Sequence, residues 1–241
     1  MNSIMTNLML VRQRLELAAI EAKREPEEIE LLAVSKTFSS RAIEEAMHAG
    51  QNAFGENYVQ EGVDKIQQLA KLRPWITWHF IGPLQSNKTK EVAEHFDWVH
   101  SIDRLKIAER LSSQRGEFSD LEYLQVCVQV NVSEEGSKSG VSLSEAEALC
   151  IEIAQLPNIV LRGLMAIPAP STSIEEQKLA FASVKECFLK IKSQHPYDLG
   201  FEFFDTLSMG MSEDLEAAIA EGSTMLRVGS AIFGKRDKID A

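Results

Sequence analysis

The chain has 241 residues and a formal net charge of −11, from 25 basic and 36 acidic residues. A surface this acidic repels nucleic acid and anionic lipid over most of its area, which argues against a nucleic-acid or membrane partner. Three widely spaced cysteines without a CxxC pair predict a reducing, cytoplasmic location, and no uncharged apolar run approaches the roughly 18 residues of a membrane span.

Predicted helices and strands alternate along the chain. Apolar residues at helical spacing predict an amphipathic helix at the start: Ile4, Leu8, Val11, Leu15 and Ala18. Apolar runs predict strands at 31–34, 53–55, 75–81, 98–100, 123–132, 159–167, 204–207 and 225–228. Helices are predicted between them: from Ser40 to Gly50, over about 58–72, after Ser86, from near Asp103, after Ser142, after Ser173, and from Ser212 to Gly222. Capping boxes pair Ser142 with Glu145 and Ser173 with Glu176.

Eight strand–helix units in a chain of 241 residues predict a (β/α)8 TIM barrel, preceded by the first helix as an extra element. The strands are unbroken apolar runs, which is typical of a parallel sheet covered on both faces. The alternative is a doubly wound open sheet, which leaves the first helix unexplained. Because no linker or low-complexity tract interrupts the pattern, we expect one domain over residues 1–241.

Lys36 is the first candidate functional residue, because active sites of TIM barrels lie at the carboxyl ends of the strands. Strand alternation puts Leu32, Val34 and Lys36 on one face, so Lys36 points into the barrel if Val34 does. An ammonium held partly out of water loses its proton more readily and becomes a nucleophilic amine. The alternative is a lysine that bends out to solvent.

Two turns near the end of the chain predict a phosphate site. Ser212, as the cap of a helix that follows a strand, combines a hydroxyl with free backbone N–H groups. Gly229 and Ser230 follow the last strand, and loops after strands seven and eight often bind phosphate in TIM barrels. Arg227, just before them, can donate a hydrogen bond to a pyridine nitrogen and keep it unprotonated. The alternatives are plain helix capping for Ser212 and a structural ion pair for Arg227.

Other residues give weaker signals. Asn57 follows the second strand and can contact a ligand oxygen, whereas His79, inside the third strand, is expected to be a core residue. Lys138 lies in a stretch rich in glycine and serine and is either a solvated charge or a secondary amine over the barrel mouth. The histidines share no ligand spacing with carboxylates, so no metal is expected.

Several motifs together resemble the YggS/PROSC family of pyridoxal phosphate homeostasis proteins. They are AVSKT at 33–37, FGENY at 54–58, WHFIGPLQSNK at 78–88, GLMAI at 163–167, LSMGMS at 207–212 and RVG at 227–229. The resemblance implies the alanine-racemase N-terminal barrel, fold type III among pyridoxal phosphate proteins. It implies Lys36 as the Schiff-base lysine, Ser212, Gly229 and Ser230 as the phosphate cradle, Arg227 facing the pyridine nitrogen and Asn57 in contact with the cofactor. Family members often have threonine where this chain has Ser230, and both residues carry the hydroxyl.

The resemblance implies a role in storing, supplying or buffering pyridoxal 5′-phosphate, with no settled catalytic activity and with apo-enzymes as transient partners. Two enzyme alternatives stay open: an amino-acid racemase of low activity that uses Lys36, and a sugar-phosphate enzyme on the same barrel. In the resembling racemases a second base comes from an additional domain that this chain lacks, so efficient catalysis is not expected. We expect a monomer, because no dimerisation element is visible.

Overall fold

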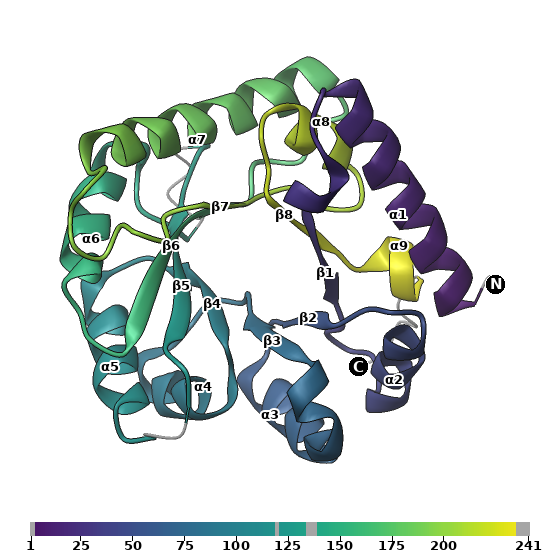
Figure 1. The fold of residues 1–241 in the computed structure, drawn as a ribbon, viewed down its shortest axis with the longest axis horizontal. Coiled ribbons are helices and arrows are strands. Elements are labelled where there is room, and N and C mark those ends of the chain that lie inside the picture. The colour runs from purple at the N-terminus through teal and green to yellow at the C-terminus, as the bar shows by residue number, and fades with distance from the viewer. Residues whose placement is uncertain (1–2, 119–120, 134–138, 235–241) are drawn as a thin grey trace.

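Eight parallel strands close into a barrel in the order of the sequence, as Figure 1 shows. The computed structural model describes residues 3–118, 121–133 and 139–234. The strands are β1 (Glu30–Val34), β2 (Ala53–Glu56), β3 (Thr77–Phe80), β4 (Trp98–Ile102), β5 (Leu124–Val130), β6 (Ile159–Ala166), β7 (Thr206–Ser208) and β8 (Met225–Val228). The barrel closes where β1 pairs with β8, from Glu30 opposite Met225 to Ala33 opposite Val228. The predicted TIM barrel is confirmed, and the open-sheet alternative is wrong.

Helices surround the barrel (Figure 1). They are α1 (Ile4–Glu21), α2 (Ser40–His48), α3 (Val59–Gln68), α4 (Thr89–His95), α5 (Leu105–Arg115), α6 (Leu143–Ala154), α7 (Ile174–Gln194), α8 (Leu215–Ala220) and α9 (Ser230–Phe233). The extra helix is α1, and its predicted apolar stripe is buried at Leu8, Val11, Leu15 and Ala18. Ser3 caps α1 by accepting a hydrogen bond from the Thr6 N–H group.

Helix α1 lies against both the first and the last parts of the barrel wall (Figure 1). The Asn7 amide donates to the carbonyl of Ile232, 2.8 Å away. The Arg24 guanidinium donates to the carbonyls of Ile219 and Ser223, at 3.0 and 2.7 Å. Because these acceptors are almost the whole chain length away, α1 covers the seam where β1 meets β8.

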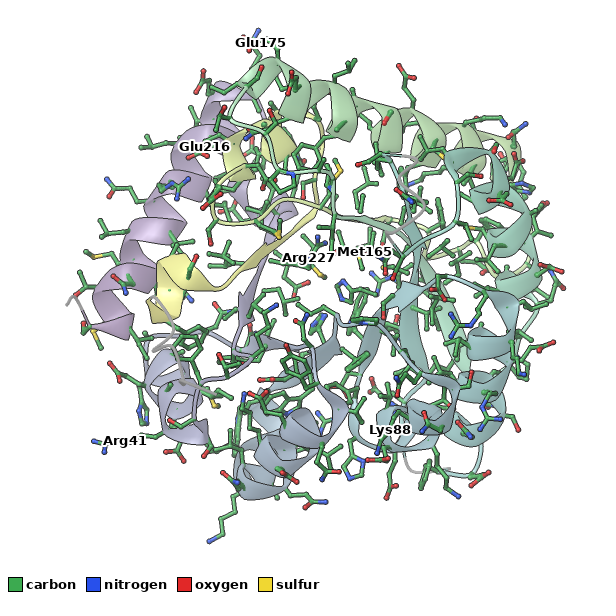
Figure 2. The ribbon with its side chains drawn as sticks, turned by 180° about the vertical axis from the view of Figure 1, so that it is seen from behind. Arg41, Lys88, Met165, Glu175, Glu216 and Arg227 are labelled. Atoms are coloured by element: carbon green, nitrogen blue, oxygen red, sulfur yellow. The ribbon has the colours of Figure 1, made fainter. Side chains whose placement is uncertain are left out.

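Side chains of the strands alternate between the inside of the barrel and the layer beneath the helices, as the period of two requires. Leu32 and Val34 belong to the interior cluster, whereas Leu31 and Ala33 belong to the outer core. The interior cluster also holds Ala53, Ile81, Trp98, Cys127, Met165 and Met225. Met165 and Arg227 lie within the ring of strands, whereas Arg41 and Glu175 lie on the helices at the outer edge of the molecule (Figure 2). Val34 points into the barrel, which is the condition under which the sequence predicts the same for Lys36.

Local boundaries differ from the sequence predictions at a few places. Trp75 lies in a 3-10 turn over Ala70–Trp75, so β3 begins two residues later than predicted. Ser86 opens another 3-10 turn instead of capping α4. The capping box of Ser142 is confirmed. Ser173 caps α7, but the Glu176 carboxylate accepts from the Ser171 hydroxyl instead of completing the box.

Candidate functional site

Lys36 lies just beyond the carboxyl end of β1 and is half-buried. The Ser35 N–H group still donates to the Gly55 carbonyl of β2. The chain then turns, and the Phe38 N–H group donates to the Ser35 carbonyl at 3.0 Å. Lys36 is therefore held at the barrel rim by a strand on one side and a closed turn on the other.

Gly229 and Ser230 lie next to this corner. Since Ala33 pairs with Val228, Gly229 abuts Val34, and a Cβ atom at Gly229 would stand 3.2 Å from the Val34 carbonyl oxygen. Ser230 is the first residue of α9. The rings of Phe38 and Phe233 stack with their centroids 5.0 Å apart, which joins the turn after Lys36 to α9.

Ser212 completes this group, although not in the predicted way. Its hydroxyl accepts a hydrogen bond from the Ser230 hydroxyl at 3.3 Å, so the two predicted phosphate turns meet. The prediction that Ser212 caps a helix is wrong, because α8 begins two residues later with Asp214 at its N-cap. Arg14 holds the Ser212 carbonyl, and the Asp214 carboxylate accepts from the Met211 N–H group. The site therefore offers two hydroxyls and the start of α9 to an anion, whereas the start of α8 does not belong to it.

Asn57 lies at the same height as Lys36, because each follows a residue of the Val34–Gly55 pair by two positions. The loop is held close to Gly82, where a Cβ atom would stand 2.1 Å from the Asn57 carbonyl oxygen. The Asn57 side-chain oxygen Oδ1 is buried and has no hydrogen-bond partner within the described ranges. A buried acceptor without a partner is the kind of group that a ligand satisfies.

Arg227 lies deeper, opposite Leu32 on β1, with its side chain inside the barrel (Figure 2). It donates to the carbonyl and the hydroxyl of Ser208 at 2.6 and 2.7 Å, and to the Ala166 carbonyl at 2.9 Å. Burial lowers the pKa of Arg227 to about 10, so it stays charged at neutral pH. Its hydrogen bonds within the described residues use three of its five N–H groups and involve no carboxylate, against the ion-pair alternative.

A chain of hydrogen bonds leads from Arg227 across the interior. Ser208 Oγ lies 2.9 Å from His100 Nδ1, and His100 Nε2 lies 2.9 Å from His79 Nδ1. Arg227 can only donate, so the Ser208 hydroxyl donates onward to His100, and His100 donates to His79. This direction leaves only the His79 Nε2–H group without a partner among the described residues, whereas the reverse direction would also strand the Ser208 proton.

The two histidines of this hydrogen-bond network, His79 and His100, are neutral. Burial lowers the pKa of His79 to about 3. Burial is the main reason that the pKa of His100 lies well below its ordinary value, and unfavourable electrostatic interactions with His79 and Arg227 lower this pKa further. The His79 ring also stacks on Trp98, with centroids 5.2 Å apart. His79 is thus the core residue that the sequence predicts, but it belongs to a polar network that ends at Arg227.

Sequence reasoning missed a buried ion cluster on the outer side of the Lys36 corner. Lys65 Nζ lies 2.7 Å from carboxylate oxygens of both Glu56 and Glu61. The sequence carries a signal for it, because Lys65 stands among buried positions of α3, beside Ile66 and four residues after Glu61. His100 and Ser208 were also missed, and no local pattern marks either of them.

A surface hollow of about 460 Å³ lies at the other end of the barrel, near the amino ends of β1 and β2. Its lining includes Glu16, Glu27 and Glu30. Acidic walls repel an anionic ligand, and active sites of TIM barrels lie at the carboxyl ends of the strands. The chemistry therefore favours the rim around Lys36 over this hollow.

Three further points depend on which residues the structure describes. Lys138 lies outside them, so its predicted role stays a prediction. No set of three or more His, Cys, Asp or Glu side chains in those ranges is arranged to hold a metal ion. Within the same residues, no helix has both the length and the apolar character needed to cross a membrane.

Comparisons with known proteins place this barrel in a family. Residues 12–237 match the model of the alanine racemase N-terminal domain. The chain is 53% identical over 238 residues to the pyridoxal phosphate homeostasis protein of Escherichia coli K12, covering 98% of each chain. It is 52% identical over 237 residues to the protein of that name from Pseudomonas aeruginosa PAO1, covering 98% of this chain and 97% of the relative.

Solved structures agree with this placement. PipY of Synechococcus elongatus, solved with pyridoxal phosphate bound, has a TM-score of 0.78 and 37% identity over 91% of this chain and 98% of its own. Alanine racemase from Corynebacterium glutamicum, at a TM-score of 0.69 and 17% identity, shares the fold over 97% of this chain and 61% of its own. The chain therefore belongs to the family of pyridoxal phosphate homeostasis proteins, with the barrel of the alanine racemase N-terminal domain.

Proposed function

We propose that this protein binds pyridoxal 5′-phosphate as a Schiff base on Lys36 and acts in cofactor homeostasis rather than as an efficient enzyme. The observation that carries the proposal is the convergence of Lys36, Asn57 and the Gly229–Ser230 turn at one rim of the barrel. Relatives at 52–53% identity are named for pyridoxal phosphate homeostasis, and PipY was solved with this cofactor bound.

The residues present fit the chemical groups of the cofactor. The paired hydroxyls of Ser212 and Ser230 can donate to a phosphate, and Gly229 allows the backbone to approach it. Arg227 has N–H groups left for the pyridine nitrogen, and it cannot give up a proton there at neutral pH. Asn57 brings a side-chain amide whose oxygen lacks a partner in the described structure.

The cofactor supplies an aldehyde, and Lys36 supplies the amine. The Lys36 amine would hold the cofactor through a C=N bond, with the aldehyde oxygen released as water. The reaction is reversible, so the same lysine can release the cofactor to an apo-enzyme. We infer transient apo-enzyme partners, and a single-domain monomer as the working unit.

The proposal of a carrier is supported by the described residues, among which we identify no well-placed second acid–base group beside Lys36. Racemisation needs proton transfer on both faces of a carbanion, hence two positioned groups. The tyrosines Tyr58, Tyr123 and Tyr197 are all exposed, and the two interior histidines are buried and neutral. A ring nitrogen facing Arg227 also withdraws electrons poorly. The second candidate is an amino-acid racemase of low activity, which the likeness of the fold to alanine racemase favours.

The proposal is tested on purified protein by its visible absorbance before and after borohydride reduction. Lys36→Ala should abolish the reducible band, because Lys36 is the amine at the same height as Asn57 and beside the Gly229–Ser230 turn, whereas Lys190→Ala, which removes an exposed lysine of α7, should leave it intact. A reducible band of full intensity in Lys36→Ala would assign the Schiff base to another lysine. Racemisation of a free amino acid at an ordinary enzymatic rate, lost in Lys36→Ala, would instead favour the racemase.

A further inference from the structure

The buried ion cluster beside Lys36 has a single ammonium at its centre. Lys65 Nζ donates to Glu56 Oε1 and Glu61 Oε1, each at 2.7 Å, and to the Ser35 carbonyl at 2.8 Å. These bonds use all three of its protons. The side chain of Lys65 is only 6% exposed and that of Glu56 is fully buried.

Burying these charges costs free energy, so a purely structural purpose does not explain the cluster well. Two carboxylates face one ammonium, and burial raises the pKa of Glu56 even though Lys65 opposes the shift. Glu56 Oε2 has no hydrogen-bond partner within the described ranges. Apolar side chains of similar size often stabilise a core as well as a buried ion pair does. The role of the cluster is therefore better sought in what it holds.

The cluster holds both residues that flank Lys36. On one side, the Ser35 hydroxyl donates to Glu56 Oε1 at 2.6 Å, in addition to the bond between the Ser35 carbonyl and Lys65. On the other side, the Thr37 N–H group donates to the Glu61 carboxylate. One ammonium thus links the backbone before Lys36 to the backbone after it.

Thr37 is held in a backbone conformation that a threonine rarely adopts by itself. Its φ angle is +69°, in the left-handed region that a β-branched residue rarely adopts. Such a conformation persists only where surrounding contacts impose it, and it is concentrated at functional sites. The bond from Thr37 to Glu61 is a contact of this kind, and Lys65 fixes Glu61 in place.

We propose that Lys65 is a positioning residue, which acts through Glu56 and Glu61 to fix the backbone on both sides of Lys36 and so to aim the Lys36 amine. The inference rests on the proposed function of Lys36 as the Schiff-base lysine. Lys65 itself lies on the outer side of the barrel wall, within α3; it reaches the corner directly at the Ser35 carbonyl and otherwise through Glu56 and Glu61.

The test compares full-length Lys65→Met with Lys190→Met, which removes an exposed lysine paired with Glu147. We expect Lys65→Met to bind pyridoxal phosphate roughly tenfold more weakly, equivalent to about 1.4 kcal/mol, and to shift the pH titration of its Schiff-base absorbance. Lys190→Met should match the wild type in both. Where Lys65→Met does not fold, Glu61→Gln weakens the same link, because it removes the negative charge of a partly exposed acceptor.

A second substitution separates positioning from general damage. Glycine adopts positive φ without strain, so Thr37→Gly should restore much of the affinity and the pH profile when added to Lys65→Met or Glu61→Gln. Wild-type affinity and pH profile in both single variants would overturn the proposal. So would a loss that follows reduced stability and is not rescued by Thr37→Gly. Failure of the proposed function is a different result, namely a full reducible band in Lys36→Ala.

Discussion

His79 is a buried histidine that resists protonation, and this property links pH to stability. Burial lowers its pKa to about 3 in the folded protein, from an ordinary value of 6.5. Because the pKa of His79 is lower in the folded state, the contribution of neutral His79 to the free energy of unfolding is fully present above pH 6.5. This contribution is lost as the pH falls towards 3. His100 acts in the same direction.

We therefore predict a loss of stability on mild acidification. Between pH 7 and pH 5, His79 alone should lower the free energy of unfolding by about 2 kcal/mol, at about 1.36 kcal/mol per pKa unit. Urea titrations at both pH values measure this. His79→Phe, which retains a ring against Trp98, should flatten the dependence, and Trp98→Phe, which removes no titratable group, should keep it. Equal slopes in wild type and His79→Phe would contradict the assignment.

For single residues, the sequence predicts those whose role follows from their position in one strand or turn. Alternation along one strand indicates Lys36, and a glycine after the last strand indicates the Gly229–Ser230 turn. Ser208 and His100 cannot be found this way, because the two are 108 positions apart and meet only through the closed barrel. The cap expected at Ser212 failed because Asp214 competes for the same role two residues later.

The loop between β2 and α3 depends on its neighbour after β3. Gly82 leaves room for the Asn57 carbonyl, and a methyl group there would stand 2.1 Å from that oxygen. The clashing atom is the backbone oxygen of Asn57, so the clash can be relieved only by moving the loop. The position of Asn57 is therefore fixed by the next strand as well as by its own.

Gly82→Ala should displace this loop and weaken the binding of pyridoxal phosphate roughly tenfold, or about 1.4 kcal/mol, because bound cofactor must then restore it. Fluorescence or absorbance titration measures the dissociation constant. Gly116→Ala is the matched control. Gly116 lies at the C-terminal end of α5, and its added methyl group would meet mainly the movable side-chain amide of Asn158. Unchanged affinity in Gly82→Ala would show that Asn57 is not needed at the site.

Elements were more predictable than their boundaries. Each apolar run became a strand because its residues are buried on both faces, and the Ser142 capping box fixed the start of α6. Trp75 was assigned to a strand from its neighbours' hydrophobicity, yet it is 65% exposed in a 3-10 turn that contains Pro74. Local hydrophobicity does not distinguish a strand from the turn that leads into it.

Closure of the whole barrel depends on contacts between the two ends of the described chain. β1 pairs with β8, and α1 covers the junction with hydrogen bonds to Ile219, Ser223 and Ile232. The sequence predicts α1 as an extra amphipathic helix but not its place, because its partners lie in the last units. Contacts this distant in sequence require the closure of a long loop, so we expect them to form late in folding.

Arg24→Ala should lower the free energy of unfolding by about 2–3 kcal/mol, because two carbonyl acceptors at the seam lose a charged donor. Most of the effect should appear as faster unfolding if the seam forms after the transition state. Stopped-flow unfolding in urea tests this, with Arg41→Ala, at the outer rim in Figure 2, as a control. Equal unfolding rates in the two variants would mean that Arg24 does not hold the seam.

The hydrogen-bond chain from Arg227 to His79 also determines what the barrel interior does with protons. Every donor in it points away from Arg227, and Arg227 cannot accept a proton. A proton wire has to receive at one end and release at the other, and this one is blocked at the end that faces the candidate site. This hydrogen-bond chain therefore cannot relay a proton between the barrel interior and the candidate site.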